Sequence, residues 1–290
     1  MAAGPNTFAG ARLDRAGTKR TDERWVAERL AEASTRALLV APDGVFVNEA
    51  SRPALVPVAE LGELREPVLL GLDDDGAVLA MASDGKPPAG ATLMGLREVG
   101  ALLSAEDAGL LAYGTAMVNW HRSHPHCARC GAHTEVAEAG FMRRCPNCGA
   151  EHHPRTDPVV IMLVHDGDRA LLGRQPTWPP GRYSALAGFV EPGESLEEAV
   201  AREVREETMV EVAQVEYRSS QPWPFPASLM VGFHARWASG EPDAREGELD
   251  DARWFERAEL EAIVRGETEF RVPPPLAIAR QLIDGWLGAR

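Results

Sequence analysis

The residues best suited to chemistry are glutamates in the acidic segment 194–208. Glu203 and Glu207 are four residues apart and Glu206 follows Glu203 by three, so in a helix all three project from one face. Like charges at these spacings destabilise a helix by about 0.2–0.5 kcal/mol per pair unless a positive charge lies between them. Carboxylate oxygens suit Mg²⁺ or Mn²⁺. The spacing therefore predicts a divalent-metal site on one face of a helix.

Four cysteines form a second constellation with metal-ligand spacing. Two C-x2-C pairs, Cys127 with Cys130 and Cys145 with Cys148, are separated by 14 residues. This spacing is typical of a tetrahedral zinc site in a short β excursion. Because four thiolates leave no position open for water or substrate, we predict that the zinc is structural.

Arginines lie close to the cysteines in the sequence, and two interpretations of them stay open. They are either solvated surface charges or contacts with RNA, which some zinc ribbons bind. The formal charge of −14 opposes non-specific attraction to nucleic acid. A small anionic substrate is still compatible with that charge, since metal ions can bridge it to acidic residues. The arginines are Arg122, Arg129, Arg143 and Arg144.

A third feature is the segment 220–228, which reads SQPWPFPAS. Three prolines in nine residues fix an extended backbone, and the aromatic rings between them can form walls. From composition alone, the segment is a substrate-binding wall, a rigid connector or a dimer contact.

The acidic segment resembles the Nudix box, G-x5-E-x7-R-E-U-x-E-E-x-G-U, in which U is aliphatic. One position departs from the pattern, because Met209 replaces the late glycine. If that glycine accommodates a left-handed backbone at the helix end, Met209 costs on the order of 1 kcal/mol while the metal ligands are retained. The matching positions are Gly188, Glu194, Arg202, Glu203, Val204, Glu206, Glu207 and Val210.

The proline and aromatic segment is similar to the SQPWPFPxS signature of the NADH pyrophosphatase branch of the Nudix hydrolases. The resemblance implies that Glu203, Glu207, the backbone carbonyl of Ala187 and Glu248 hold the metals, with Glu206 as a further ligand or the base. It also implies substrate contacts, including stacking of Phe189 on a base. The remaining substrate residues so implied are Gln221, Pro222, Trp223, Pro224, Phe225, Pro226, Ala227, Ser228 and Ala279.

One further position matches the family loosely, and another departs from it. Arg97 aligns with a substrate arginine, although a surface charge is an equal interpretation. His153 stands where similar proteins carry a stacking tyrosine before the proline matched by Pro154. An imidazole stacks over less area, so this departure bears on substrate affinity rather than on reaction type.

The activity that the resemblance implies is metal-dependent hydrolysis of the pyrophosphate bond of NAD(H), giving nicotinamide mononucleotide and AMP. Magnesium or manganese would be catalytic and zinc structural. The same chemistry could remove NAD caps from RNA 5′ ends, and a homodimer is the usual state in the family. An alternative from another class is a zinc-ribbon binding module with an inactivated Nudix domain; Met209 alone favours it, since every carboxylate is retained.

The elements that must position these residues predict an α+β protein. Hairpin patterns at 37–47 and 68–81 indicate a small antiparallel sheet, and a capped helix runs from Ser104 to Trp120. An apolar strand at 159–164 then opens a mixed α and β region with helices at 194–208 and 275–286. We therefore expect three domains: an N-terminal mainly β domain (1–120), a zinc ribbon (121–152) and a Nudix α/β/α sandwich with a mixed sheet (153–290).

Length and composition agree with this organisation. The 290 residues exceed the usual single-domain size, and 44% hydrophobic with 26% charged residues is ordinary globular usage. No stretch is long and apolar enough for a signal-peptide core or a membrane span, so we expect no membrane association and a cytoplasmic protein. In that reducing compartment, paired cysteines are better metal ligands than disulfides.

Overall fold

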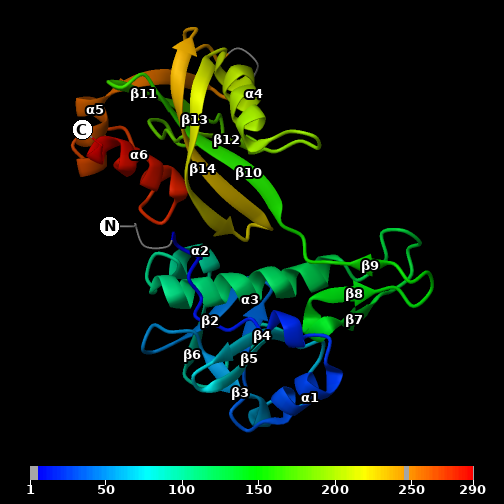
Figure 1. Cartoon of the computed structure of the whole chain (residues 1–290). Helices are drawn as coiled ribbons and strands as arrows, with labels where there is room; N and C mark the ends of the chain where they lie inside the picture. The colour runs from blue at the N-terminus through cyan, green and yellow to red at the C-terminus, as the bar shows by residue number, and fades with distance from the viewer. Residues whose placement is uncertain (1–5, 245–247, 290) are drawn as a thin grey trace. The chain divides into compact units, whose positions relative to one another are not determined.

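The computed structural model describes residues 6–244 and 248–289, and the chain divides into two compact units. Unit 1 comprises Met1–Thr156 together with Trp223–Ala227, and unit 2 comprises Asp157–Pro222 and Ser228–Arg290. Figure 1 labels the elements of both units. The outer ends of the first and third predicted domains lie outside the described residues.

Unit 1 contains a six-stranded sheet in the order β4-β5-β1-β2-β6, with β3 also paired to β1. The two predicted hairpins are present as β1–β2 and β4–β5. However, β1 and β5 pair in parallel, so the expectation of a purely antiparallel sheet was wrong. A central strand covered on both faces is apolar along its length, as β5 is. The strands are β1 (Arg36–Ala41), β2 (Gly44–Asn48), β3 (Leu55–Pro57), β4 (Val68–Asp73), β5 (Gly76–Ala82) and β6 (Ala91–Met94).

Helix α3 (Ala105–Ser123) packs on this sheet. It begins as predicted, because the Ser104 hydroxyl accepts a hydrogen bond from the backbone N–H of Asp107. Gly114 lets the helix approach closely, since a Cβ there would lie 2.4 Å from the Leu38 side chain. The other helices of the unit are α1 (Glu23–Ala31) and α2 (Leu96–Val99), with 3-10 turns at Gly17–Lys19, Val58–Glu60 and Glu138–Gly140.

The cysteine segment forms a separate three-stranded sheet in the order β7-β8-β9. Its strands are β7 (Glu135–Ala137), β8 (Met142–Arg144) and β9 (Glu151–His152). Such short strands bury little apolar surface, so this region depends on other interactions for its stability.

Unit 2 is built on a mixed sheet in the order β13-β14-β10-β11-β15, with β12 also paired to β10. The central strand β10 runs parallel to β14 and antiparallel to β11 and β12, which confirms the predicted mixed sheet. The strands are β10 (Asp157–His165), β11 (Arg169–Arg174), β12 (Leu186–Phe189), β13 (Glu211–Trp223), β14 (Ser228–Ser239) and β15 (Asp251–Glu256).

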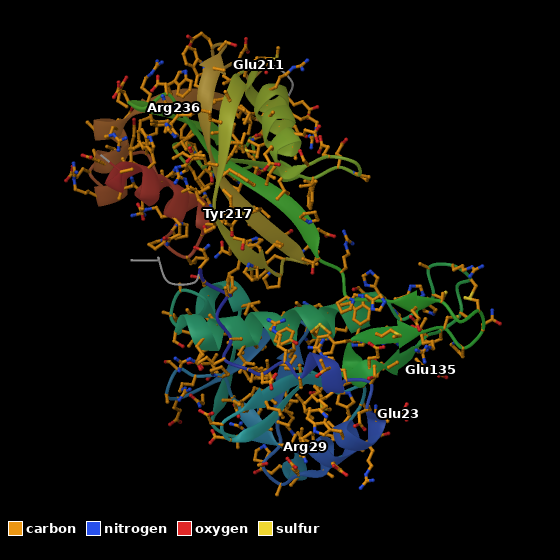
Figure 2. All side chains as sticks on the ribbon, viewed as in Figure 1. Glu23, Arg29, Glu135, Glu211, Tyr217 and Arg236 are labelled. Carbon is orange, nitrogen blue, oxygen red and sulfur yellow. The ribbon has the colours of Figure 1, made fainter. Side chains whose placement is uncertain are left out.

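Helices cover both faces of this sheet (Figure 1). Along β10, Val160 and Met162 pack into the core that α4 covers, whereas Ile161 and Leu163 pack into the core under α5 and α6. This alternation is the strand period of two, and the side chains fill both layers (Figure 2). The predicted α/β/α sandwich is therefore confirmed. The helices are α4 (Leu196–Thr208), α5 (Arg257–Arg265) and α6 (Ile278–Gly288).

Among residues 6–244 and 248–289, no helix combines the length and the apolar character that crossing a membrane requires.

Candidate active site

Helix α4 presents its glutamates because its other face is anchored. Ser195 and Glu198 form a capping box that fixes the first turn. Ala199, Val200 and Val204 lie on that other face and are fully buried against the sheet. Once that face is fixed, the remaining face of the helix has a single orientation.

A pocket of about 500 Å³ lies beside α4 in unit 2. Strand β12 with Glu191 after it, the glutamate face of α4 and the segment before β15 all contribute to its wall. The structure therefore brings together six of the residues predicted for the site: Ala187, Phe189, Glu203, Glu206, Glu207 and Glu248.

Gly188 allows Glu203 to enter this pocket. A Cβ at Gly188 would lie 1.8 Å from Cδ of Glu203 and 2.0 and 2.2 Å from its two carboxylate oxygens. Any side chain at that position would displace the carboxylate. Glu203 itself is buried, and burial is the main cause of its raised pKa.

Glu207 carries the most perturbed carboxyl group of the pocket. Burial, followed by the charges of Glu203 and Glu248, raises the pKa of Glu207 to about 8. Its buried Oε2 has no hydrogen-bond partner in the described part of the chain. A buried acceptor beside two further carboxylates is satisfied by a divalent cation with oxygen ligands, so the donor set fits magnesium or manganese.

The carboxylates surround the pocket rather than meet at one point. Within the described residues, the four cysteine sulfurs are the only metal-ligating group of three or more atoms that gathers within 4.8 Å. The carboxylate oxygens stay farther apart than the cysteine sulfurs because neighbouring carboxylates repel one another. In addition, Arg202 holds Glu203 and Glu206 by hydrogen bonds.

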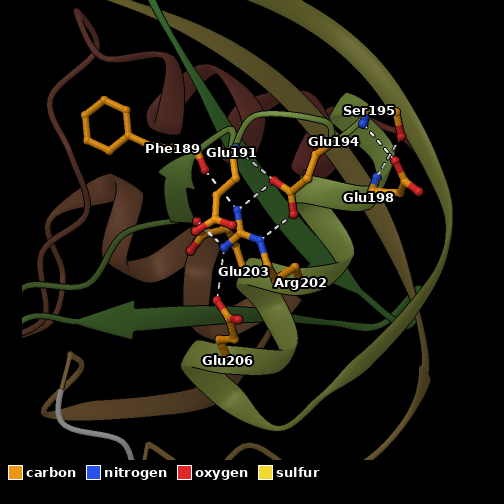
Figure 3. A network of polar contacts seen from close by, with 8 residues as sticks. All are labelled: Phe189, Glu191, Glu194, Ser195, Glu198, Arg202, Glu203 and Glu206. Atoms are coloured by element: carbon orange, nitrogen blue, oxygen red, sulfur yellow. Dashed lines mark hydrogen bonds and ion pairs between the residues drawn. The ribbon is translucent and has the colours of Figure 1, made fainter.

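Arg202 is the centre of a polar network that Figure 3 shows. Its Nη1 donates to Glu203 at 2.8 Å and to Glu206 at 3.0 Å, and its Nη2 donates to the carbonyl of Phe189 at 2.9 Å. Nε and Nη2 also donate to Glu194, which lowers the pKa of Glu194 to about 2. Arg202 was recognised in the sequence only as a position of the box; here it lines the pocket and orients its carboxylates.

Phe189, Glu191, Glu206 and Glu248 are the exposed residues that line the pocket. The Phe189 side chain is 60% exposed, so its ring is free to stack on a base. The Glu206 side chain is 56% exposed and pairs with Arg202.

Two predicted substrate residues of unit 2 serve the fold. Gln221 is buried, and its side-chain amide donates to the carbonyl of Leu276 and accepts from the N–H of Ile278, both at 2.8 Å. These bonds fix the chain at the start of α6. Ala279 is buried in the core beneath α6. Pro222 is half-buried, and Ser228 begins β14 in register with Asp157.

The aromatic residues of the SQPWPFPAS segment belong to unit 1. The rings of Trp223 and Phe225 lie 5.1 Å apart, edge to face. The guanidinium of Arg97 lies 4.4 Å from the Phe225 ring and 5.5 Å from the Trp223 ring. Arg97 is therefore stacked on aromatic rings, although it is exposed. Pro224 is buried, Ala227 is half-buried, and Pro226 and His153 are exposed.

The four cysteine sulfurs form a compact centre in unit 1. Sγ of Cys127 lies 3.6 Å from that of Cys148, and Sγ of Cys130 lies 3.5 Å from that of Cys145. A tetrahedral zinc with bonds of about 2.3 Å requires sulfur separations of about 3.8 Å, so the site fits zinc.

The two cysteine pairs adopt the same local fold. Gly131 N–H donates to the carbonyl of Cys127, and Gly149 N–H donates to the carbonyl of Cys145, each at 2.9 Å. Both glycines have left-handed backbones, with φ of 75° and 71°. Zinc ligation therefore rests on a repeated turn that depends on glycine.

The structure corrects the RNA interpretation for one arginine near the cysteines. Arg143 is only 1% exposed and donates to Thr134 and to Nδ1 of His121, with Glu66 also paired to it. Burial removes Arg143 from any RNA-binding surface.

The other three arginines differ in accessibility. Arg122 donates to the carbonyls of Val40 and Ala41. Arg144 is exposed and pairs with Glu151, and Arg129 is exposed. Arg129 and Arg144 are therefore accessible to solvent, and both interpretations, a solvated surface charge or a contact with RNA, stay open for them.

Family models match three consecutive parts of the chain. An NADH pyrophosphatase-like rudimentary Nudix domain matches residues 28–120, an NADH pyrophosphatase zinc ribbon domain matches 122–152, and a Nudix domain matches 154–273.

Relatives with curated names extend this finding. The NAD-capped RNA hydrolase NUDT12 of Macaca fascicularis is 45% identical over 64% of this chain, and its Homo sapiens counterpart is 44% identical. The chain spans 43% of the length of these two proteins. The NAD-capped RNA hydrolase NudC of Mycobacterium bovis is 40% identical over 94% of this chain and 92% of its own length. On this similarity over nearly the whole of both chains, the protein belongs to the NADH pyrophosphatase branch of the Nudix hydrolase family.

Proposed function

We propose that the protein hydrolyses the pyrophosphate bond of NAD(H) in a metal-dependent reaction that yields nicotinamide mononucleotide and AMP. The observation that carries the proposal is the pocket beside α4. It is lined by Glu203, Glu206, Glu207 and Glu248, and the buried Oε2 of Glu207 has no hydrogen-bond partner among the residues that the structure describes. An excess of negative charge around the pocket suits a site that binds cations together with a diphosphate.

Glu203, Glu207, Glu248 and the carbonyl of Ala187 would hold magnesium or manganese. When bound, these cations lower the pKa of a coordinated water and neutralise charge that develops on the phosphates. Arg202 orients Glu203 and Glu206 through direct hydrogen bonds. Because Glu206 is exposed and held at one oxygen, it is suited to accept a proton from water or to act as a further ligand. The exposed Phe189 ring provides a stacking surface for a base.

Replacing Glu207 by Gln tests this assignment. The substitution keeps size and removes the charge, so we expect turnover of NADH with magnesium or manganese to be abolished while zinc content and fold stay intact. Glu197→Gln is a matched control, because Glu197 is an exposed residue of the same helix that does not line the pocket. Persistence of turnover in Glu207→Gln would overturn the ligand assignment.

Removal of NAD caps from RNA is a second candidate function, favoured by the names of the relatives. Parallel assays on free NADH and on NAD-capped RNA compare the two. If Arg129 and Arg144 contact the RNA body, their replacement by Ala should raise KM for the capped RNA and leave KM for NADH unchanged. An unchanged KM for the capped RNA in the alanine variant, compared with the wild type, would exclude that contact.

The domain division at residues 120 and 152, a homodimeric state and a cytoplasmic location also belong to this proposal. Sedimentation equilibrium of the full chain tests the dimer.

The alternative of a binding module with an inactivated Nudix domain is disfavoured, because Glu203, Glu206 and Glu207 of the box line one pocket. Metal-dependent release of AMP from NADH would exclude it.

A further inference from the structure

Phe8, near the N-terminus, packs against the aromatic rings of the SQPWPFPAS segment within unit 1. The Phe8 ring lies 5.9 Å from the Trp223 ring and 5.9 Å from the Phe225 ring, with interplanar angles of 66° and 70°. Since Trp223 and Phe225 also meet edge to face, the three rings form a closed set of mutual contacts. Such edge-to-face contacts constrain the orientation of each ring.

The N-terminal segment accepts backbone strain to place this ring. Ala9 N–H donates to the carbonyl of Asn6, which closes a turn, and Phe8 in that turn has a φ of 72°. This left-handed conformation favours glycine in turns of this kind. Phe8 is nevertheless only 2% exposed. The packing of its ring, and not the preference of its backbone, therefore explains why a phenylalanine occupies this position.

Gly100 provides the space that the ring occupies. A Cβ at Gly100 would lie 2.5 Å from Cζ and 2.6 Å from Cε1 of Phe8. The backbone of Gly100 is right-handed, with φ of −59°, and the next nearest atom to a Cβ there is the Leu96 carbonyl oxygen at 3.4 Å, so the contact with Phe8 is the main obstacle to alanine. Gly100 therefore offers an independent way to displace the Phe8 ring.

Trp223 and Phe225 are half-buried, so each ring has one part packed and another part accessible. Resting on the proposed function, and on the substrate contacts that the family resemblance implies for this segment, we propose that Phe8 is a positioning residue that holds the Trp223 and Phe225 rings for stacking on the substrate. Phe8 is remote in sequence from the Nudix box and does not line the carboxylate pocket. Its effect should thus fall on substrate binding and not on the chemical step.

The test combines equilibrium binding with kinetics. Binding of NADH is measured calorimetrically on the full chain carrying Glu207→Gln, which prevents consumption of the ligand, with and without Phe8→Ala. We expect about tenfold weaker binding, as for the loss of one base-stacking contact. In the otherwise wild-type enzyme, Phe8→Ala should raise KM for NADH by a similar factor and leave kcat unchanged.

Three further variants separate positioning from general loss of stability. Phe8→Leu, which refills the space without approaching Gly100 more closely, should restore most of the binding. Gly100→Ala should reproduce the Phe8→Ala effect, and the double variant should be no worse than either single one. Phe46→Leu, in the buried core of the same unit, should lower thermal stability without changing KM.

The outcomes distinguish this inference from the proposed function. Binding of NADH without cleavage by the wild-type protein would overturn the proposed function, whereas weaker binding in Phe8→Ala would still support the role of Phe8. Unchanged binding and KM in Phe8→Ala would overturn the role of Phe8 alone, as would a KM increase of equal size in Phe46→Leu. Absence of NADH binding to the wild-type protein would overturn both.

Discussion

Replacing Gly188 by Ala should inactivate the protein through one steric contact. Gly188 lies in β12, paired with Val160, and its φ is not in the left-handed region, so the strand accepts alanine. The added Cβ would lie 1.8 Å from Cδ of Glu203, whereas ordinary van der Waals contact begins at 3.4 Å. The Glu203 carboxylate must therefore retreat by about 1.6 Å, and misplacement of a reacting group by about 1 Å can cost a hundredfold in rate.

The assay is kcat for NADH hydrolysis with saturating magnesium or manganese, together with zinc content and thermal unfolding. We expect kcat to fall by about a hundredfold, with zinc content unchanged because the cysteines belong to unit 1. Gly285→Ala is the matched control: it makes the same chemical change in unit 2 at a helical position where, among the described residues and apart from the local backbone of that helix, a Cβ meets no atom within 4 Å. A Gly188→Ala protein with kcat within threefold of the wild type would refute the steric argument.

Three other predictions concern stability and zinc. Met209 closes α4 with a φ of 61° and is 51% exposed, so Met209→Gly should raise the free energy of unfolding by about 1 kcal/mol in denaturant titrations; unchanged stability would show that the strain is absent. Burial, followed by the nearby His234, lowers the pKa of His165 to about 4. Because an unfolded histidine titrates near pH 6.5, the stabilisation from neutral His165 is complete above that pH and is lost as the pH falls towards 4, by about 1–3 kcal/mol. In His165→Leu, the free energy of unfolding should therefore fall less steeply between pH 6.5 and pH 4. An unaltered pH profile of stability would show that protonation of His165 is not responsible for the loss. Cys130→Ser should release zinc, measured by metal analysis, and should leave thermal unfolding of unit 2 unchanged; retention of one zinc per chain would contradict four-sulfur ligation.

Patterns of local period and spacing were sufficient for several features. The glutamate spacing predicted that the carboxylates of the acidic segment share one face of a helix, and Glu203, Glu206 and Glu207 of α4 line one pocket. The cysteine spacing predicted a centre that the four sulfurs form. The left-handed backbone at Met209 also followed from the box, because the box has a glycine at that position and glycine commonly ends a helix in the left-handed conformation.

Other features depend on contacts between residues distant in the sequence. Parallel pairing of β1 with β5 joins two hairpins whose separate patterns carry no sign of their relative direction. Burial of Arg143 could not be foreseen, because His121 and Glu66 lie 22 and 77 residues away. The same holds for Gln221, whose amide serves the start of α6, and for Phe8, whose partners lie more than 200 residues away.

The sequence by itself determined which side chains are available for chemistry and which elements carry them, because helix period, strand alternation and ligand spacing are local properties of the chain. Only the tertiary structure decided that Gly188 leaves room for Glu203 and that Arg202 reaches from its helix to the carbonyl of Phe189 in β12. It also decided that Glu207 is buried enough to lift its pKa to about 8. Steric space and desolvation arise from the packing of elements against one another, and no short segment contains that information.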